Sequence, residues 1–255
     1  MGLFDKLFSK KECSICGGEI GLLGNRKLED GNLCKNCAAK LSPWFNDRRS
    51  STVDAIRKQL EDRESNLEKV AAFRTTRTLG TDTKLLLDED AGKFMVTDAR
   101  NLMEANPDVL DFSDVTGCVL DINEDRTEVM REDKDGNSVS YTPSRYKYEY
   151  DFHIIVQVRN PYFDEIRFQL NDHSVELGSG GVTARPNPAM SMEYNRYKEM
   201  GEEIRDTLLQ LRQQTRAEAA AAAAPKAAVS CPYCGAMTIP TPAGCCEYCG
   251  GSVNV

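Results

Sequence analysis

Four cysteines near the start of the chain have the spacing of a metal site. They form two C-x2-C pairs, Cys13 with Cys16 and Cys34 with Cys37, separated by seventeen residues. A gap of two residues lets both sulfurs of a pair reach one tetrahedral ion, and two such pairs are typical of structural zinc sites. Gly17 follows the first pair, where the chain must turn tightly. The pattern predicts a zinc ion bound by Cys13, Cys16, Cys34 and Cys37.

The same spacing recurs at the other end, in Cys231-Pro232-Tyr233-Cys234 and Cys246-Glu247-Tyr248-Cys249. Cys245 directly precedes Cys246, which leaves the choice of ligand open; Cys246 keeps the two-residue gap to Cys249 and is our choice. Both sets consist of thiols alone, without the open position of a hydrolytic zinc site. The sequence predicts a second structural zinc ion bound by Cys231, Cys234, Cys246 and Cys249.

The ten cysteines of this 255-residue chain also allow disulfides or redox-active pairs. Eight of them sit in C-x2-C pairs, however, and residues 1–11 lack the long apolar core and cleavage site of a secretory signal. No apolar run approaches the roughly 20 residues that a membrane-spanning helix needs. We therefore expect bound metal in a reducing cytoplasm.

The net charge of −8 is unevenly distributed along the chain. Residues 1–78 carry 15 basic and 11 acidic side chains (+4), residues 79–181 carry 10 and 22 (−12), and residues 182–255 balance at zero. Affinity for nucleic acid or for anionic lipid head groups depends on clustered Lys and Arg. The acidic centre therefore argues against either as the ligand of the central region.

The N-terminal third of the chain divides into three predicted elements. Residues 1–11 read as a short amphipathic helix, whose residues 2–11 would contact a membrane surface, a partner or their own domain; the alternative is a frayed terminus. Residues 12–47 form the four-cysteine finger, treble-clef-like, with a helix that starts on its second pair. Residues 48–76 form a long helix, which begins at the capping box Ser51-Thr52-Val53-Asp54.

The long helix should bury an apolar stripe against the central domain or a second copy of itself. The stripe is interrupted by Arg63, and its members recur at a/d spacing: Val53, Ile56, Leu60, Leu67 and Val70.

From residue 79 the apolar period changes to two, which indicates strands. The clearest runs from Tyr146 to Val158, with its even-numbered side chains on one face. The other expected strands are 84–88, 93–96, 109–115, 118–122, 127–130, 139–141, 166–170 and 175–177. Gly178-Ser179-Gly180-Gly181 reads as a flexible excursion, and a helix with Tyr197, Ile204 and Leu208 on one stripe follows.

These patterns predict an α+β protein. Residues 79–216 are expected to form a PH-like (pleckstrin-homology-like) antiparallel β-barrel or sandwich closed by a C-terminal helix. Residues 217–229 are an alanine-rich linker interrupted by Pro225, and residues 230–255 are a zinc ribbon.

Residues 12–80, and more loosely the strand region that follows, resemble an uncharacterised bacterial family whose members carry an N-terminal four-cysteine domain of unknown function. The resemblance rests on the two N-terminal cysteine pairs, on Trp44-Phe45 and on Arg48-Arg49-Ser50-Ser51. It implies zinc binding and supplies no activity.

Other chemistry is sparse. The two histidines, His153 and His173, lie outside any hydrolase or nucleophile motif, and Cys118 reads as a core residue. The acidic run 88–90 resembles a solvated hairpin tip, and the glycine run 178–181 lacks the lysine of a phosphate-binding loop.

We therefore predict a non-enzymatic zinc-binding adaptor whose central domain binds a protein partner. The alternatives are a nucleic-acid-associated factor that uses its zinc modules, a protein held at the inner face of a membrane through residues 2–11, and an enzyme of unrecognised type. The oligomeric state stays open.

Overall fold

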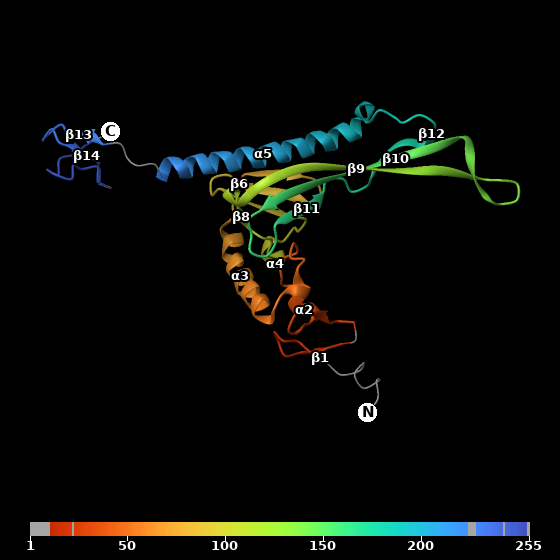
Figure 1. Ribbon diagram of the computed structural model, residues 1–255, viewed down its shortest axis with the longest axis horizontal. Helices are drawn as coiled ribbons and strands as arrows, with labels where there is room; N and C mark the ends of the chain where they lie inside the picture. Colours follow the sequence, from red (N-terminus) through yellow and green to blue (C-terminus); the bar gives the residue numbers. More distant parts are fainter. Residues whose placement is uncertain (1–10, 22, 224–227, 242, 254–255) are drawn as a thin grey trace. The chain divides into compact units, whose positions relative to one another are not determined.

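A computed structural model describes residues 11–21, 23–223, 228–241 and 243–253 (Figure 1). The chain is a mixture of helices and small antiparallel sheets and divides into two compact units, residues 1–213 and 214–255. The helix expected over residues 1–11 falls on residues 1–10, which lie outside the described residues, and on Lys11, which belongs to a strand.

The first unit begins with a small finger made of two short hairpins and one helical turn. Strand β1 (Lys11–Glu12) pairs with β2 (Glu19–Ile20), β3 (Arg26–Lys27) pairs with β4 (Asn32–Leu33), and α2 (Lys35–Ala38) follows. The finger is too small to build a core alone. It therefore packs Leu28 and Leu33 with Ile56 of the next helix in one buried cluster.

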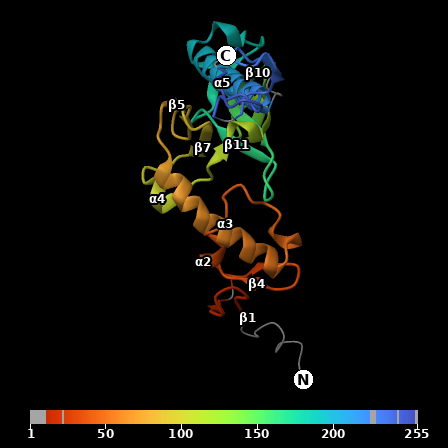
Figure 2. The same ribbon diagram turned by 90° about the vertical axis from the view of Figure 1, so that its left-hand side faces the viewer.

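The long helix α3 spans Val53–Ala72 and is shorter than expected at both ends. A separate 3-10 turn, η1 (Arg48–Ser50), precedes it, and its N-cap is Thr52, whose side chain accepts a hydrogen bond from the Ala55 amide. Phe73 is already extended, so the expected boundaries of 48–76 are wrong. Figure 2 shows α3 running from the finger to the sheets.

The buried stripe of α3 differs from the predicted one. Its members are Ile56, Gln59, Arg63, Asn66 and Val70. Leu60 and Leu67 are only partly buried, so hydrophobic spacing placed the interface one helical row away. The cause is a set of polar contacts: Asn66 donates to the Pro107 carbonyl at 2.7 Å and accepts from the Val109 amide at 3.1 Å. Such partners offset the cost of burying Asn66, and they favour the inward orientation of this face of the helix.

The first sheet is a meander, β5 (Arg77–Gly80), β6 (Lys84–Asp88), β7 (Lys93–Thr97) and β8 (Leu110–Asp111). The strand expected over 109–115 is therefore only two residues long. A helical turn, α4 (Leu102–Ala105), precedes it and a 3-10 turn, η2 (Phe112–Asp114), follows it.

The second sheet is built on two long strands, β9 (Val115–Glu132) and β10 (Ser138–Val158). Each replaces two of the predicted strands. β11 (Glu165–Gln169) and β12 (Val175–Val182) pair with successive parts of the other edge of β10. The glycine run 178–181 is part of β12, because Val182 still pairs with Tyr146; the flexible excursion expected there is wrong. In Figure 1 the β9–β10 ribbon extends beyond β11 and β12.

One hydrophobic core joins both sheets to the helix α5 (Met192–Ala223), which follows the 3-10 turn η3 (Pro188–Met190). The even-numbered residues of β10 from Tyr148 to Val158 are buried, as predicted. Phe152 contacts the rings of Tyr194 and Tyr197 on α5. No ladder joins the two sheets among the described residues, so the barrel alternative is not realised. The turn η2 separates β8 from β9 and prevents one ladder from continuing into the next.

The second unit contains the end of α5 and a small module. β13 (Val229–Ser230) pairs with β14 (Met237–Thr238), and Cys245 forms an isolated bridge with Ser252. Cys231, Cys246 and Val253 form its core. The first half of the predicted linker, up to Ala223, is helical.

Candidate metal centres

The structure brings the four N-terminal cysteines together. The sulfurs of Cys13, Cys16, Cys34 and Cys37 all lie within 4.8 Å of one another. Cys13 and Cys16 come from the turn between β1 and β2, whereas Cys34 is the N-cap of α2 and Cys37 lies in its only full turn. A helix therefore does begin on the second pair.

The distances fit a tetrahedral zinc ion. The Cys16 and Cys34 sulfurs are 3.8 Å apart. Four sulfurs at about 2.3 Å from one zinc would be separated by about 3.8 Å along each edge of the tetrahedron. A disulfide needs a sulfur separation of about 2.05 Å, and all these cysteines are free thiols.

Backbone amides point at the sulfurs and prepare them for a cation. The Cys34 amide donates to the Cys13 sulfur at 3.3 Å, and the Cys37 amide donates to the Cys34 sulfur at 3.4 Å. The Gly17 amide closes the first turn on the Cys13 carbonyl at 2.8 Å. Gly17 has a φ of +70°, a conformation that favours glycine.

The four thiols are electrostatically unequal without a metal. Burial alone would raise the pKa of Cys13, but the amides of Cys16, Cys34 and Ile15 lower it to about 6. Burial and the neighbouring sulfurs raise the pKa of Cys37. A divalent cation would remove this inequality between the thiols, because it stabilises all four thiolates at once.

The C-terminal cluster repeats this geometry. The sulfurs of Cys231, Cys234, Cys246 and Cys249 lie within 4.8 Å of one another, with Cys231–Cys249 at 3.6 Å and Cys234–Cys246 at 3.8 Å. Both pairs are followed by a glycine amide that donates to the first cysteine's carbonyl, Gly235 to Cys231 at 2.8 Å and Gly250 to Cys246 at 2.9 Å.

The structure also distinguishes the two adjacent cysteines. The Cys246 sulfur belongs to the cluster and accepts from the Tyr248 amide at 3.4 Å. The Cys245 sulfur faces the Ala243 carbonyl at 3.6 Å instead. The amides of Cys249 and Tyr248 outweigh burial and lower the pKa of Cys246 to about 6.

The remaining candidate groups are scattered. His153 lies on β10, where burial lowers its pKa, whereas exposed His173 has a raised pKa because of Asp172.

Cys118 is buried in the main core. Asp88 accepts the amides of Arg74 and Ala91, so it closes a hairpin. Across the described ranges, the two cysteine sets are the clusters with metal-binding geometry.

Sequence reasoning missed a buried polar centre beside the first cluster. Arg63 pairs with Asp108 at 2.8 Å, and both side chains are nearly buried (9% and 12% exposed). Arg63 also donates to the Lys40 and Asn106 carbonyls, and Ser42 donates to Asp108 at 2.7 Å. This centre ties the finger, α3 and the loop after α4 together. The sequence did contain a signal for this centre. Arg63 stands seven residues from both Ile56 and Val70, so it lies on the same buried row of α3.

Residues 11–59 match a family described as "Domain of unknown function (DUF4428)". The match covers the finger and the beginning of α3, including Cys13, Cys16, Cys34 and Cys37. Neither the curated proteins nor the solved structures searched contain a match to the chain. The comparisons therefore name no activity, and the assignment of metal to the finger rests on the geometry of its four cysteines.

No helix in the part of the chain that the structure describes is long and apolar enough to cross a bilayer. The cytoplasmic location stays a prediction from the sequence.

Proposed function

We propose that this protein is a non-enzymatic adaptor, stabilised by two zinc ions, whose central domain binds a protein partner. Zinc binding rests on one observation: each cluster supplies four sulfurs at tetrahedral spacing and leaves no ligand position for a substrate. In small modules such an ion stabilises the fold, by about 10–16 kcal/mol of binding free energy.

Metal analysis of purified, reduced protein tests the zinc proposal. We expect two equivalents of zinc per chain. The adjacent cysteines offer a matched pair of variants: Cys246→Ser should lose one equivalent, and Cys245→Ser should keep both. Fewer than one equivalent in the wild type, or equal loss in both variants, would contradict the assignment.

The central domain, residues 79–216, is proposed to be PH-like. A four-stranded meander, a second antiparallel sheet and a C-terminal helix over one shared core support this proposal. Two features depart from the PH-like pattern: the β9–β10 ribbon is long, and no ladder joins the two sheets within the described ranges.

The outer edge of β9 is the proposed docking site for a partner. Within the described ranges this 18-residue strand pairs with β10 alone, which leaves its other edge without a ladder. An unpaired edge accepts an added strand. With 22 acidic and 10 basic side chains in residues 79–181, a basic or neutral segment fits best.

Affinity purification from a native extract, with nuclease, tests the platform proposal. Asp125→Lys, exposed on β9, should lose the proteins that the wild type retains. Asp90→Lys, equally charged and exposed beyond the end of β6, should keep them. Equal retention by both variants would reject the β9 edge. Salt-sensitive binding to anionic liposomes would favour the membrane alternative, and nuclease-sensitive binding the nucleic-acid one.

A further inference from the structure

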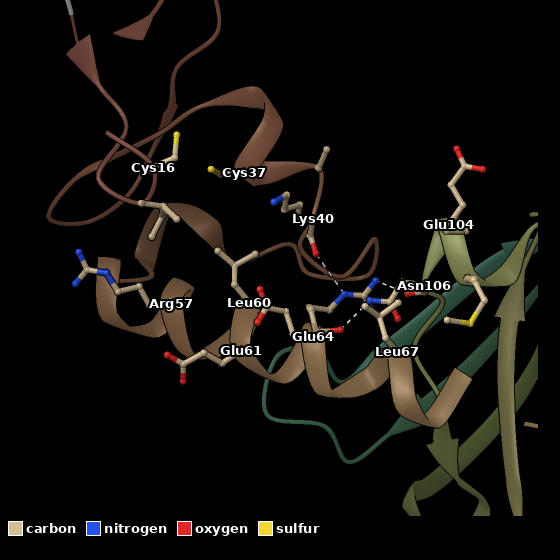
Figure 3. Close-up of a pocket in the computed structure, with 15 residues that line it drawn as sticks. Cys16, Cys37, Lys40, Arg57, Leu60, Glu61, Glu64, Leu67, Glu104 and Asn106 are labelled. Atoms are coloured by element: carbon tan, nitrogen blue, oxygen red, sulfur yellow. Dashed lines mark hydrogen bonds between the residues drawn. The ribbon is translucent and has the colours of Figure 1, made fainter. Parts of the chain in front are cut away.

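A groove of about 620 Å³ lies between the finger, α3 and α4 (Figure 3). One end is formed by Cys16 and Cys37 of the first cluster, the wall by α3 from Arg57 to Leu67, and the far side by α4. All these elements belong to the first compact unit. At 1.5 Å per residue, the stretch of α3 along the groove is about 15 Å long.

The floor of the groove is apolar, and the described residues cover it only in part. Leu60 and Leu67 lie here because the polar contacts of Arg63 and Asn66 turn the neighbouring row of α3 inward. Met103 on α4 also lines the groove and is 49% exposed. Burying such side chains is worth about 25 cal/mol per Å² of apolar surface, so the groove favours an apolar occupant.

The rim of the groove is acidic. Glu61, Glu64 and Glu104 line it, and none of them has an ion-pair partner in the described ranges. The arginines of the groove are already paired, Arg57 with Asp54 and Arg63 with Asp108. Lys40 is the remaining cation of the lining, so three carboxylates against one ammonium leave a charge of −2.

We propose that residues 2–8 of this chain occupy the groove. The segment is Gly2-Leu3-Phe4-Asp5-Lys6-Leu7-Phe8, and Lys10 and Lys11 follow it. Its four large apolar side chains match the leucine and methionine floor. Residues 2–11 contain three lysines and one aspartate, a charge of +2 that complements the −2 of the rim.

The tether makes this docking geometrically easy. Lys11 is two residues from Cys13, whose sulfur lies within 4.8 Å of the Cys16 and Cys37 sulfurs at the end of the groove. Ten residues of chain span up to about 35 Å, more than twice the length of the groove. Short tethers give effective concentrations of about millimolar, so an intrinsic dissociation constant of about 0.1 mM already gives mostly docked segment.

This inference is independent of what β9 binds. It assigns residues 2–8 to their own domain, in preference to a membrane or a partner. The docked segment would bury Leu60 and Leu67, which the a/d spacing of α3 predicted to be buried.

Photo-crosslinking in the full chain tests the proposal. With p-benzoylphenylalanine in place of Phe8, dilute protein should give an intramolecular crosslink to Met103 or to the 60–67 stretch of α3, identified by mass spectrometry. Glu64→Lys on the rim should lower its yield about two- to fivefold, the range of a surface ion pair. Glu68→Lys, exposed on α3 outside the groove, should leave the yield unchanged.

Three outcomes would overturn the proposal. Crosslinks at other sites would place the segment elsewhere, and crosslinks only between two chains would make a second copy the occupant. Equal yields in the wild type, Glu64→Lys and Glu68→Lys would show that the rim does not attract the segment. Zinc content and β9-dependent capture are measured separately, so their failure is distinguishable from failure of this inference.

Discussion

At the scale of single residues, the centre around Arg63 determines how the finger is attached. A buried guanidinium is costly to desolvate, and only its full set of partners offsets that cost. Asp108, the Lys40 carbonyl and the Asn106 carbonyl supply that set from three separate segments. The ion pair therefore specifies the arrangement more than it stabilises it.

Removing Arg63 should be strongly destabilising. Arg63→Met leaves the nearly buried Asp108 carboxylate without its cation, with only the Ser42 hydroxyl still donating to it, and we expect a loss of about 3–5 kcal/mol in the free energy of unfolding. Arg57→Met removes an exposed pair on the same helix (54% and 88% exposed) and should cost less than about 1 kcal/mol. Urea denaturation of zinc-loaded protein measures both. Similar losses in the two variants would contradict the role of the buried pair.

Cys118 makes stability depend on pH in the alkaline range. Burial raises the pKa of its thiol from 9.0 to about 12, so the folded protein holds this proton more tightly than the unfolded chain does. Its contribution is complete below pH 9 and is lost as the pH rises from 9 toward 12. The wild type should lose up to about 1.4 kcal/mol per pH unit there relative to Cys118→Ala. Parallel curves in urea titrations from pH 8 to 10.5 would refute this.

At the scale of elements, α5 approaches β9 closely at one glycine. A Cβ atom on Gly201 would lie 2.5 Å from Cδ1 of Leu120. Gly201 is buried with Tyr197, Ile204 and Leu208 on the same helix. The absence of a side chain here lets the helix and the strand share the core.

Gly201→Leu should separate α5 from β9. Overpacking of this kind costs about 1–3 kcal/mol in the free energy of unfolding, more than the helix gains from losing a glycine. Glu199→Leu places the same side chain on the exposed face of α5 and should change stability by less than about 0.5 kcal/mol. Thermal unfolding compares the two, and a neutral Gly201→Leu would show that the contact is loose.

At the scale of the whole molecule, the two compact units divide the chain within α5. The buried residues of α5 end at Leu208, and the helix continues to Ala223 without another fully buried side chain. The C-terminal module has its own core of Cys231, Cys246 and Val253 around its own cluster. Each unit should therefore fold separately.

Deleting residues 225–255 tests this independence. The shortened chain should keep one zinc equivalent and the cooperative thermal transition of the first unit, within about 2 °C. Chelation should then destabilise the remaining finger. Loss of most of the transition on deletion would mean that the C-terminal module is part of the main fold.

The sequence by itself determined the features that depend on local spacing. The C-x2-C pairs fix which sulfurs can meet, because a two-residue gap and the turn at Gly17 or Gly235 already aim both sulfurs at one point. The strict alternation from Tyr148 to Val158 likewise fixed the buried face of β10, since successive strand residues point to opposite sides.

Only the tertiary structure decided features that depend on distant partners. The apolar spacing of α3 predicted Leu60 and Leu67 inside, yet Arg63 and Asn66 turn inward because Asp108, Pro107 and Val109 supply their hydrogen bonds. Those partners lie more than 40 residues away, so no local pattern contains them. The glycine run of β12 reads as flexible alone, yet it stays within the strand as a local irregularity because Leu177 and Val182 on either side of it pair with Tyr148 and Tyr146. The groove follows from the same long-range contacts, since it lies where Leu60 and Leu67 of the predicted stripe are only partly buried.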